Sequence, residues 1–188
     1  MDPIALFQRT LADAERTVAS VSPDELRKPT PCSDWTVQQV VEHMTGTNWA
    51  FTRAVSGQAA PGAQGAPAAG GDAPAAAYAA SARAALAAWQ TPGALEKTLN
   101  LPFGQMPGAQ AIGFNIGDQL MHTWDVAKAT GRDRTLDPEA TAVVFERVQQ
   151  VLTPEARGPG RPFGVEQPCP PDAPIHDRLA AFLGRSVT

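Results

Sequence analysis

Between Lys97 and Asp125 the chain carries one formal charge, Asp118, in a stretch otherwise made of apolar, small and neutral polar residues. The spacing of its apolar residues predicts a helix over residues 107–129, followed by Gly131, a favoured residue just past a helix C-terminus. A solvent-exposed helix normally carries several charges on a broad polar face, and this segment does not. We therefore expect the helix to lie in the interior of a helical bundle.

Helical periodicity recurs along the rest of the chain. Further helices are predicted over residues 3–19, 74–90, 138–152 and 175–183. Thr36 and Gln39 form a T-x-x-Q capping box, which predicts the start of another helix, with Met44 and Phe51 on its core face. Residues 95–106 could form a short extended or hairpin segment. Five or six helices with little strand predict an all-α fold, an antiparallel four-helix bundle with extra short helices.

The length of 188 residues favours a single domain, residues 1–188, that can bury a core without a stabilising metal or disulfide. Residues 56–73 are rich in alanine, glycine and proline and lack large apolar side chains, so they are expected to form a flexible loop. Cys32 and Cys169 lie far apart and next to prolines. Each is expected to be a lone thiol.

Charge and hydropathy argue against several classes of partner. The formal net charge is −4, and the scattered lysines and arginines form no basic surface for nucleic acid. No long apolar run predicts a membrane span, and charges such as Arg9 and Asp13 interrupt the N-terminal segment. We therefore expect a cytoplasmic protein that binds a small-molecule substrate or thiol, and assembly into a homodimer stays open. No G-x-S-x-G, P-loop or G-x-G-x-x-G motif supports a serine hydrolase or a nucleotide-binding protein.

A narrow polar stripe runs along the helix predicted over residues 107–129. Asn115, Asp118, His122 and Asp125 fall in one sector of a helical wheel, and apolar residues border the sector on both sides. In a bundle interior an unpaired carboxylate or imidazole would be strongly destabilising. These side chains must therefore be hydrogen-bonded or bound to a cation.

The spacing of Asp118 and His122 suits two ligands of one metal ion, because residues one turn apart have Cβ atoms about 5–6 Å from each other. His43, at the edge of the apolar face of the helix that begins after Thr36, would supply a third ligand. The three residues predict a two-histidine, one-carboxylate site with positions open to water or substrate. Asp125 follows His122 by three residues and is placed to accept its second ring N–H.

Simpler interpretations of these residues stay open. Asp118 and His122 could form a buried hydrogen bond with no metal, and His43 could be an ordinary interface histidine. Cys32 precedes the second helix and could lie near His43, although packing alone would explain its position. His176 could be an exposed neighbour of a helix start or a partner of a metal ligand.

Two segments resemble a known family: TPCSDWTVQQVVEHMTG, residues 30–46, and GDQLMHTWDVAKATGR, residues 117–132. They are similar to the DinB-like superfamily, and most to its actinobacterial metal-binding branch, related to the N-terminal domain of mycothiol-dependent maleylpyruvate isomerase. The resemblance implies a four-helix bundle with a divalent metal, usually zinc or nickel. By position, it implies that the ligands are His43, Asp118 and His122.

Two departures limit what the resemblance implies. Asp118 stands where the isomerase has a glutamate, so a metal would lie closer to the helix that carries this shorter side chain. We also expect no counterpart of the isomerase's additional C-terminal domain. Isomerase activity is therefore not assumed.

The resemblance implies a thiol transferase or isomerase in which the metal lowers the pKa of a bound thiol, with mycothiol as the cosubstrate. Two alternatives stay open: a metal-dependent hydrolase, which would activate water with the same ligands, and a noncatalytic protein that binds a metal or small ligand. Arg53 and Arg83 are the candidates for a cationic pocket that would receive the thiol.

Overall fold

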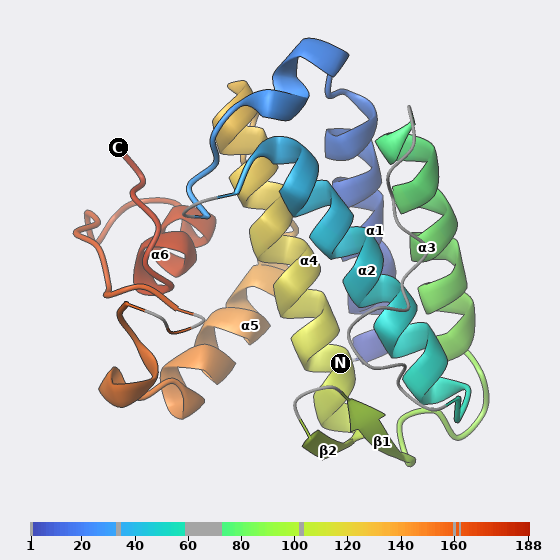
Figure 1. The fold of residues 1–188 in the computed structure, drawn as a ribbon. Coiled ribbons are helices and arrows are strands. Elements are labelled where there is room, and N and C mark those ends of the chain that lie inside the picture. Colours follow the sequence, from blue (N-terminus) through green and yellow to red (C-terminus); the bar gives the residue numbers. More distant parts are fainter. Residues whose placement is uncertain (1, 33–34, 59–72, 102–103, 160, 162) are drawn as a thin grey trace.

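The computed structural model describes residues 2–32, 35–58, 73–101, 104–159, 161 and 163–188. Four long helices form an antiparallel bundle (Figure 1): α1 (Pro3–Ala19), α2 (Val37–Val55), α3 (Pro74–Trp89) and α4 (Gly108–Thr130). Helices α1 and α2 each pack against both α3 and α4. The all-α bundle predicted from the sequence is confirmed.

The remaining elements attach to one side and to both ends of this bundle (Figure 1). They are the 3₁₀ turns η1 (Pro23–Arg27) and η2 (Pro154–Ala156), the helices α5 (Pro138–Val151) and α6 (Ile175–Phe182), and the strands β1 (Thr98–Leu101) and β2 (Gly104–Pro107). Helix α5 packs against α4 and α6. The strands form an antiparallel pair with Leu99 opposite Met106, which confirms the extended segment expected at residues 95–106.

Local sequence signals account for where the helices begin and end. At the start of α2 the Thr36 N–H donates to Gln39 Oε1 at 2.9 Å, and the Gln39 N–H donates to Thr36 Oγ1 at 3.4 Å. Asp137 caps α5 in a similar way by accepting from the Ala140 N–H at 2.8 Å. Helix α4 ends at Gly131, whose φ of 69° is the left-handed conformation that glycine adopts without steric cost.

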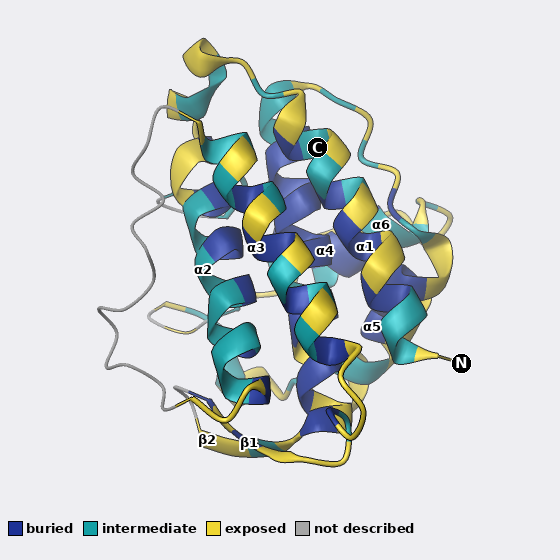
Figure 2. Cartoon of the chain, turned by 90° about the vertical axis from the view of Figure 1, so that its right-hand side faces the viewer, coloured by how far each residue is buried: buried dark blue, intermediate teal, exposed yellow. Residues whose placement is uncertain are grey.

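Helix α4 is the central element of the bundle. Every residue from 119 to 127 is buried, so the helix has no solvent face over these two and a half turns. Figure 2 shows it largely dark blue behind α1 and α3. This burial explains why the segment carries so few charges, and it requires a partner for each polar side chain that α4 does carry.

Gln119 connects α4 to two neighbouring helices from the middle of the core. Its side chain is fully buried. The Tyr78 hydroxyl on α3 donates to Gln119 Oε1 at 2.8 Å, and Gln119 Nε2 donates to the Met44 carbonyl on α2 at 3.1 Å. The same amide nitrogen also donates to Asp118 Oδ2 at 3.2 Å. A single amide thus ties three helices together beside the polar stripe.

The alanine-, glycine- and proline-rich stretch 56–73, expected to be a flexible loop, lies outside the described residues except at its two ends. Among the helices that the structure describes, none has both the length and the apolar character needed to cross a membrane.

We expect Gln119→Leu to destabilise the fold by about 1–3 kcal/mol, because the buried Tyr78 hydroxyl loses its acceptor. Adding Tyr78→Phe should recover part of this loss, since no buried hydroxyl then remains unpaired. Urea unfolding of the two single variants and the double variant measures the coupling. Strictly additive losses would show that the two side chains do not depend on each other.

Candidate metal centre

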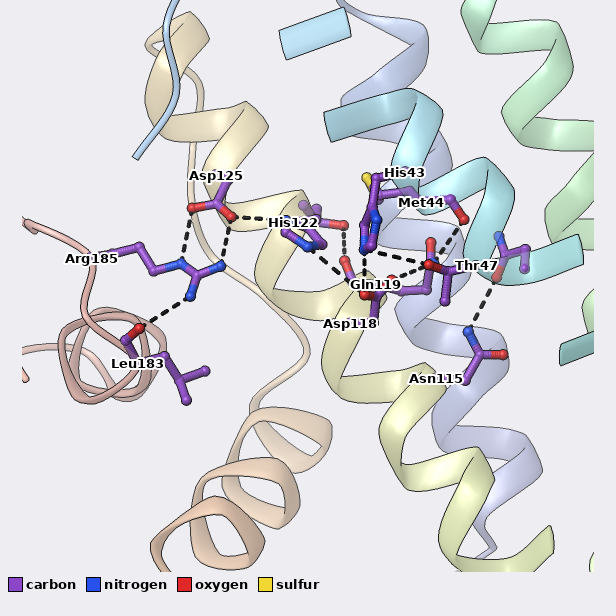
Figure 3. Close-up of polar contacts among 12 residues, drawn as sticks. His43, Met44, Thr47, Asn115, Asp118, Gln119, His122, Asp125, Leu183 and Arg185 are labelled. Atoms are coloured by element: carbon purple, nitrogen blue, oxygen red, sulfur yellow. Dashed lines mark hydrogen bonds and ion pairs between the residues drawn. The ribbon is translucent and has the colours of Figure 1, made fainter. Parts of the chain in front are cut away.

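The three residues expected to bind a metal lie together. His43 projects from α2, and Asp118 and His122 project from successive turns of α4 (Figure 3). The Nε2 atom of His43 is 2.8 Å from Asp118 Oδ1, and the Nε2 atom of His122 is 3.8 Å from the same oxygen. One ligand atom from each residue lies within 4.8 Å of the other two. The packing of α2 against α4 therefore brings together residues that are 75 positions apart in the chain.

The geometry of these atoms suits a divalent ion. Two ligands about 2.0–2.2 Å from one ion lie about 2.8–3.6 Å apart in octahedral or tetrahedral coordination. Of the two distances from Asp118 Oδ1, 2.8 Å lies at the lower end of that range and 3.8 Å just above it. Imidazole and carboxylate together suit zinc and nickel among other transition metals. The residues present fit a metal ion after small side-chain adjustments.

The pKa values of His43 and Asp118 are coupled. Burial lowers the pKa of His43, but the hydrogen bond to Asp118 and the charge of that carboxylate outweigh it, so the pKa of His43 is raised above 6.5. Burial raises the pKa of Asp118, but the hydrogen bond from His43 and the nearby histidines lower it below 3.8 overall. The pair thus favours the ionised carboxylate that a metal ligand requires.

Asp125 holds His122 in place, as the sequence suggested. Its Oδ2 lies 3.0 Å from His122 Nδ1, so Nε2 is the ring nitrogen on the Asp118 side. Asp125 is itself fully buried and accepts hydrogen bonds from Arg185 at 3.3 and 3.1 Å (Figure 3). Burial raises the pKa of Asp125, but the charge of Arg185 and the hydrogen bond to His122 lower it overall.

Trp35 and Cys32, which precede α2, also lie close to the histidines. The Trp35 ring centroid is 4.8 Å from that of His43 and 5.8 Å from that of His122, so the indole covers both imidazoles. Cys32 is a free cysteine close to His122 and Asp125 and could form a second three-ligand group with them. Burial, reinforced by the charge of Asp125, raises the pKa of the Cys32 thiol to about 11.

A cavity of about 1110 Å³ opens beside these residues. His43, Asp118 and His122 line it together with residues of α5, described residues between 158 and 167, and the C-terminal residues 183–185. The ligand positions left open by three protein residues would therefore face space large enough for a small molecule.

Sequence reasoning missed the most important supporting residue, Arg185. It lies 60 positions from Asp125 in a segment with no periodic pattern, and only its ion pair with a buried carboxylate reveals its role. The cationic candidates named from the sequence, Arg53 and Arg83, do not line the cavity; among the described residues its arginines are Arg147, Arg161 and Arg185.

His176 lies on α6, outside the cavity, and is neither exposed nor in contact with the three candidate ligands. Its imidazole is 3.9 Å from Asp177, and burial lowers its pKa. The structure therefore supports neither of the two roles considered from the sequence.

A helical bundle with two histidines and a carboxylate facing one cavity is the arrangement expected of a DinB-like protein. The chain belongs to the mycothiol maleylpyruvate isomerase N-terminal domain family, whose model matches residues 7–127. The matched segment contains His43, Asp118, His122 and Asp125 and ends before α5.

Two relatives cover the whole chain. They are uncharacterized proteins of Mycobacterium tuberculosis, from strains CDC 1551 / Oshkosh and ATCC 25618 / H37Rv, and each is 39% identical over 187 residues, covering 100% of both chains. The crystal structure of the mycothiol-dependent maleylpyruvate isomerase matches with a TM-score of 0.55 at 16% identity, over 66% of this chain and 59% of that chain. This likeness shows the shared fold, and the chain spans 59% of the isomerase's length.

In chelator-treated protein we expect His43 to titrate above pH 6.5, and in Asp118→Asn to titrate below 6.5. The carboxylate raises this pKa, whereas burial, which remains in the variant, lowers it. The C2-proton resonance of His43, followed by NMR as a function of pH, measures both values. His176 serves as the internal control and should titrate unchanged; an unchanged pKa of His43 would contradict the pairing.

Proposed function

We propose that His43, Asp118 and His122 hold a divalent metal ion and that the protein uses it to bind and activate a low-molecular-weight thiol. Zinc and nickel are the expected ions, and mycothiol is the thiol that the family suggests. One observation carries the proposal: three ligand atoms from two helices lie within 4.8 Å of one another, beside a cavity of about 1110 Å³.

A divalent ion at this position would supply Lewis acidity, which lowers the pKa of a coordinated thiol or water and favours the nucleophilic form near neutral pH. Other residues of the chain orient the candidate ligands and shield them from water. Asp125 accepts from His122 Nδ1 and so leaves the Nε2 lone pair for a ligand bond. Arg185 keeps Asp125 ionised, and Trp35 shields one side of both imidazoles from water.

An external thiol is favoured over Cys32 as the reactive sulfur. Burial and the nearby charge of Asp125 both raise the pKa of the Cys32 thiol and so disfavour its thiolate, the nucleophilic form. The cavity, by contrast, has room for a thiol and a second substrate beside the candidate ligands. This arrangement supports a transferase or isomerase, in which a thiolate attacks an electrophilic substrate, with the electrophile left open.

We expect protein purified without chelator to contain about one divalent ion per chain, and His122→Ala to lose it. The variant should keep its helicity, because the bundle has a core large enough to fold without a metal. Elemental analysis and circular dichroism measure the two properties. His176→Ala is the matched control and should keep the ion, since His176 lies outside the cavity. Full metal retention in His122→Ala would refute the site.

If the ion binds a thiol, adding mycothiol to cobalt-substituted protein should produce a sulfur-to-cobalt charge-transfer band. The band should titrate with an apparent pKa below the value of about 8.5 for a thiol in water, because the cation stabilises the thiolate. Absorption spectra recorded across a pH series test this. Cys32→Ser should still give the band, which excludes the internal sulfur as its source.

A panel of small thiols that leaves the spectrum unchanged, with cobalt bound, would contradict thiol activation. Hydrolysis through a bound water, or capture of a ligand without catalysis, would then be the better account of the same three ligands.

A further inference from the structure

Exposed apolar side chains gather in the cavity beside the candidate metal centre. Among the described residues four large hydrophobic side chains are exposed: Phe114, Val143, Val151 and Val165. All of them except Val143 line the cavity, and Val144, Val148 and Phe163 line it as well. Apolar surface exposed in a concave site favours a ligand with an apolar body.

The charges of the cavity differ from those of the chain as a whole. The protein has a formal net charge of −4, yet the described residues that line the cavity include three arginines, Arg147, Arg161 and Arg185, and one carboxylate, Asp118. Arg185 is paired with Asp125. Among the described residues, neither Arg147 nor Arg161 has a carboxylate within ion-pair distance. These two arginines are therefore available to an anionic group of a ligand.

Arg147 contacts α4 on the N-terminal side of the candidate ligands. Its guanidinium carbon is 3.8 Å from the position that a Cβ would occupy on Gly113 of α4, and it stacks over the Phe114 ring at 5.3 Å. Asp118 and His122 follow Gly113 by five and nine residues, so they lie about 8 and 14 Å further along the helix axis and about 140° and 180° around it. A ligand that reaches from Arg147 to these residues must therefore span more than about 8 Å, which takes about 7 atoms or more of an extended chain at ~1.2 Å per atom.

The cationic side of the cavity lies outside the segment that matches the family. The match ends at residue 127, whereas Arg147, Val151 and Arg161 all follow it; Phe114, by contrast, lies within the match. The candidate ligands and the two unpaired arginines thus come from different parts of the chain.

We propose that this cavity binds an amphipathic monoanion whose anionic head pairs with Arg147 and Arg161 and whose apolar body extends toward His122. The inference names the substrate class for the centre proposed above. It rests on the proposed function only for the reaction at the end of the ligand that lies near His122. Binding itself uses the arginines and the apolar wall, so it can be measured without a metal.

Isothermal titration of the full-length protein with octanoate, both as purified and after chelator treatment, tests the proposal. Octanoate should bind in both states, and octan-1-ol and acetate should each bind at least about tenfold more weakly, because each lacks one of the two recognised features. Equal binding of octan-1-ol would show that the cavity does not recognise an anion and would overturn the proposal.

Two variants with matched controls locate the ligand. Arg147→Gln should weaken octanoate binding by about tenfold through loss of charge-assisted hydrogen bonds, and adding Arg161→Gln should weaken it further. Arg83→Gln on α3 should have no effect. Val151→Asp should also weaken binding, whereas Val143→Asp, an exposed valine of the same helix outside the cavity, should not.

The outcomes separate this inference from the metal proposal. If no metal is retained but octanoate binding depends on Arg147, the inference stands without the metal centre. If octanoate binding is unchanged in Arg147→Gln and lost in His43→Ala, the head group binds at the histidines and the inference is overturned. Absence of octanoate binding in a folded, metal-loaded protein would overturn it as well.

Discussion

The constraint on which the rest of the structure depends is a pair of carboxylates on one central helix, Asp125 fully buried and Asp118 partly buried. Asp118 and Asp125 lie on α4, in or beside the stretch from 119 to 127 that has no solvent face. A buried carboxylate is tolerated only when hydrogen bonds and positive charge compensate it. Asp118 accepts hydrogen bonds from His43 on α2 and from Gln119 on its own helix. Asp125 accepts hydrogen bonds from Arg185 in the C-terminal segment. The packing of α2 and of the C-terminus against α4 is thus tied to the electrostatics of the polar stripe.

The side chains that stabilise these carboxylates also form a group of donors suited to a metal ion. If the only requirement were to neutralise Asp118, one histidine would suffice, yet His122 also lies 3.8 Å from the same oxygen and is oriented by a second aspartate. Two imidazoles and a carboxylate that converge beside a cavity form a donor set suited to a divalent ion. The family match covers this donor set and part of the cavity wall, and the chain beyond residue 127 supplies the rest of the described wall, including its arginines.

Much of the fold could be predicted because its signals are local. The capping box at Thr36, the apolar spacing along each helix and the glycine after α4 each act within a few residues, and all appear in the structure. The grouping of His43, Asp118 and His122 was also predicted, since a one-turn spacing within α4 and a facing position on α2 follow from helix geometry. Their role as metal ligands remains a prediction, as does the single domain.

Sequence alone determined the positions of the helices, the burial of α4 and the polar stripe along it. These follow from hydrophobic periodicity, which is a pattern among residues close together in the chain. Only the tertiary structure decided which distant side chains meet that stripe. Arg185 pairs with Asp125 across 60 residues, Trp35 covers the two imidazoles from an irregular segment, and Arg147 reaches the cavity instead of Arg53 or Arg83. No local pattern encodes these contacts, since they depend on how loops and short helices pack onto the bundle after it has formed.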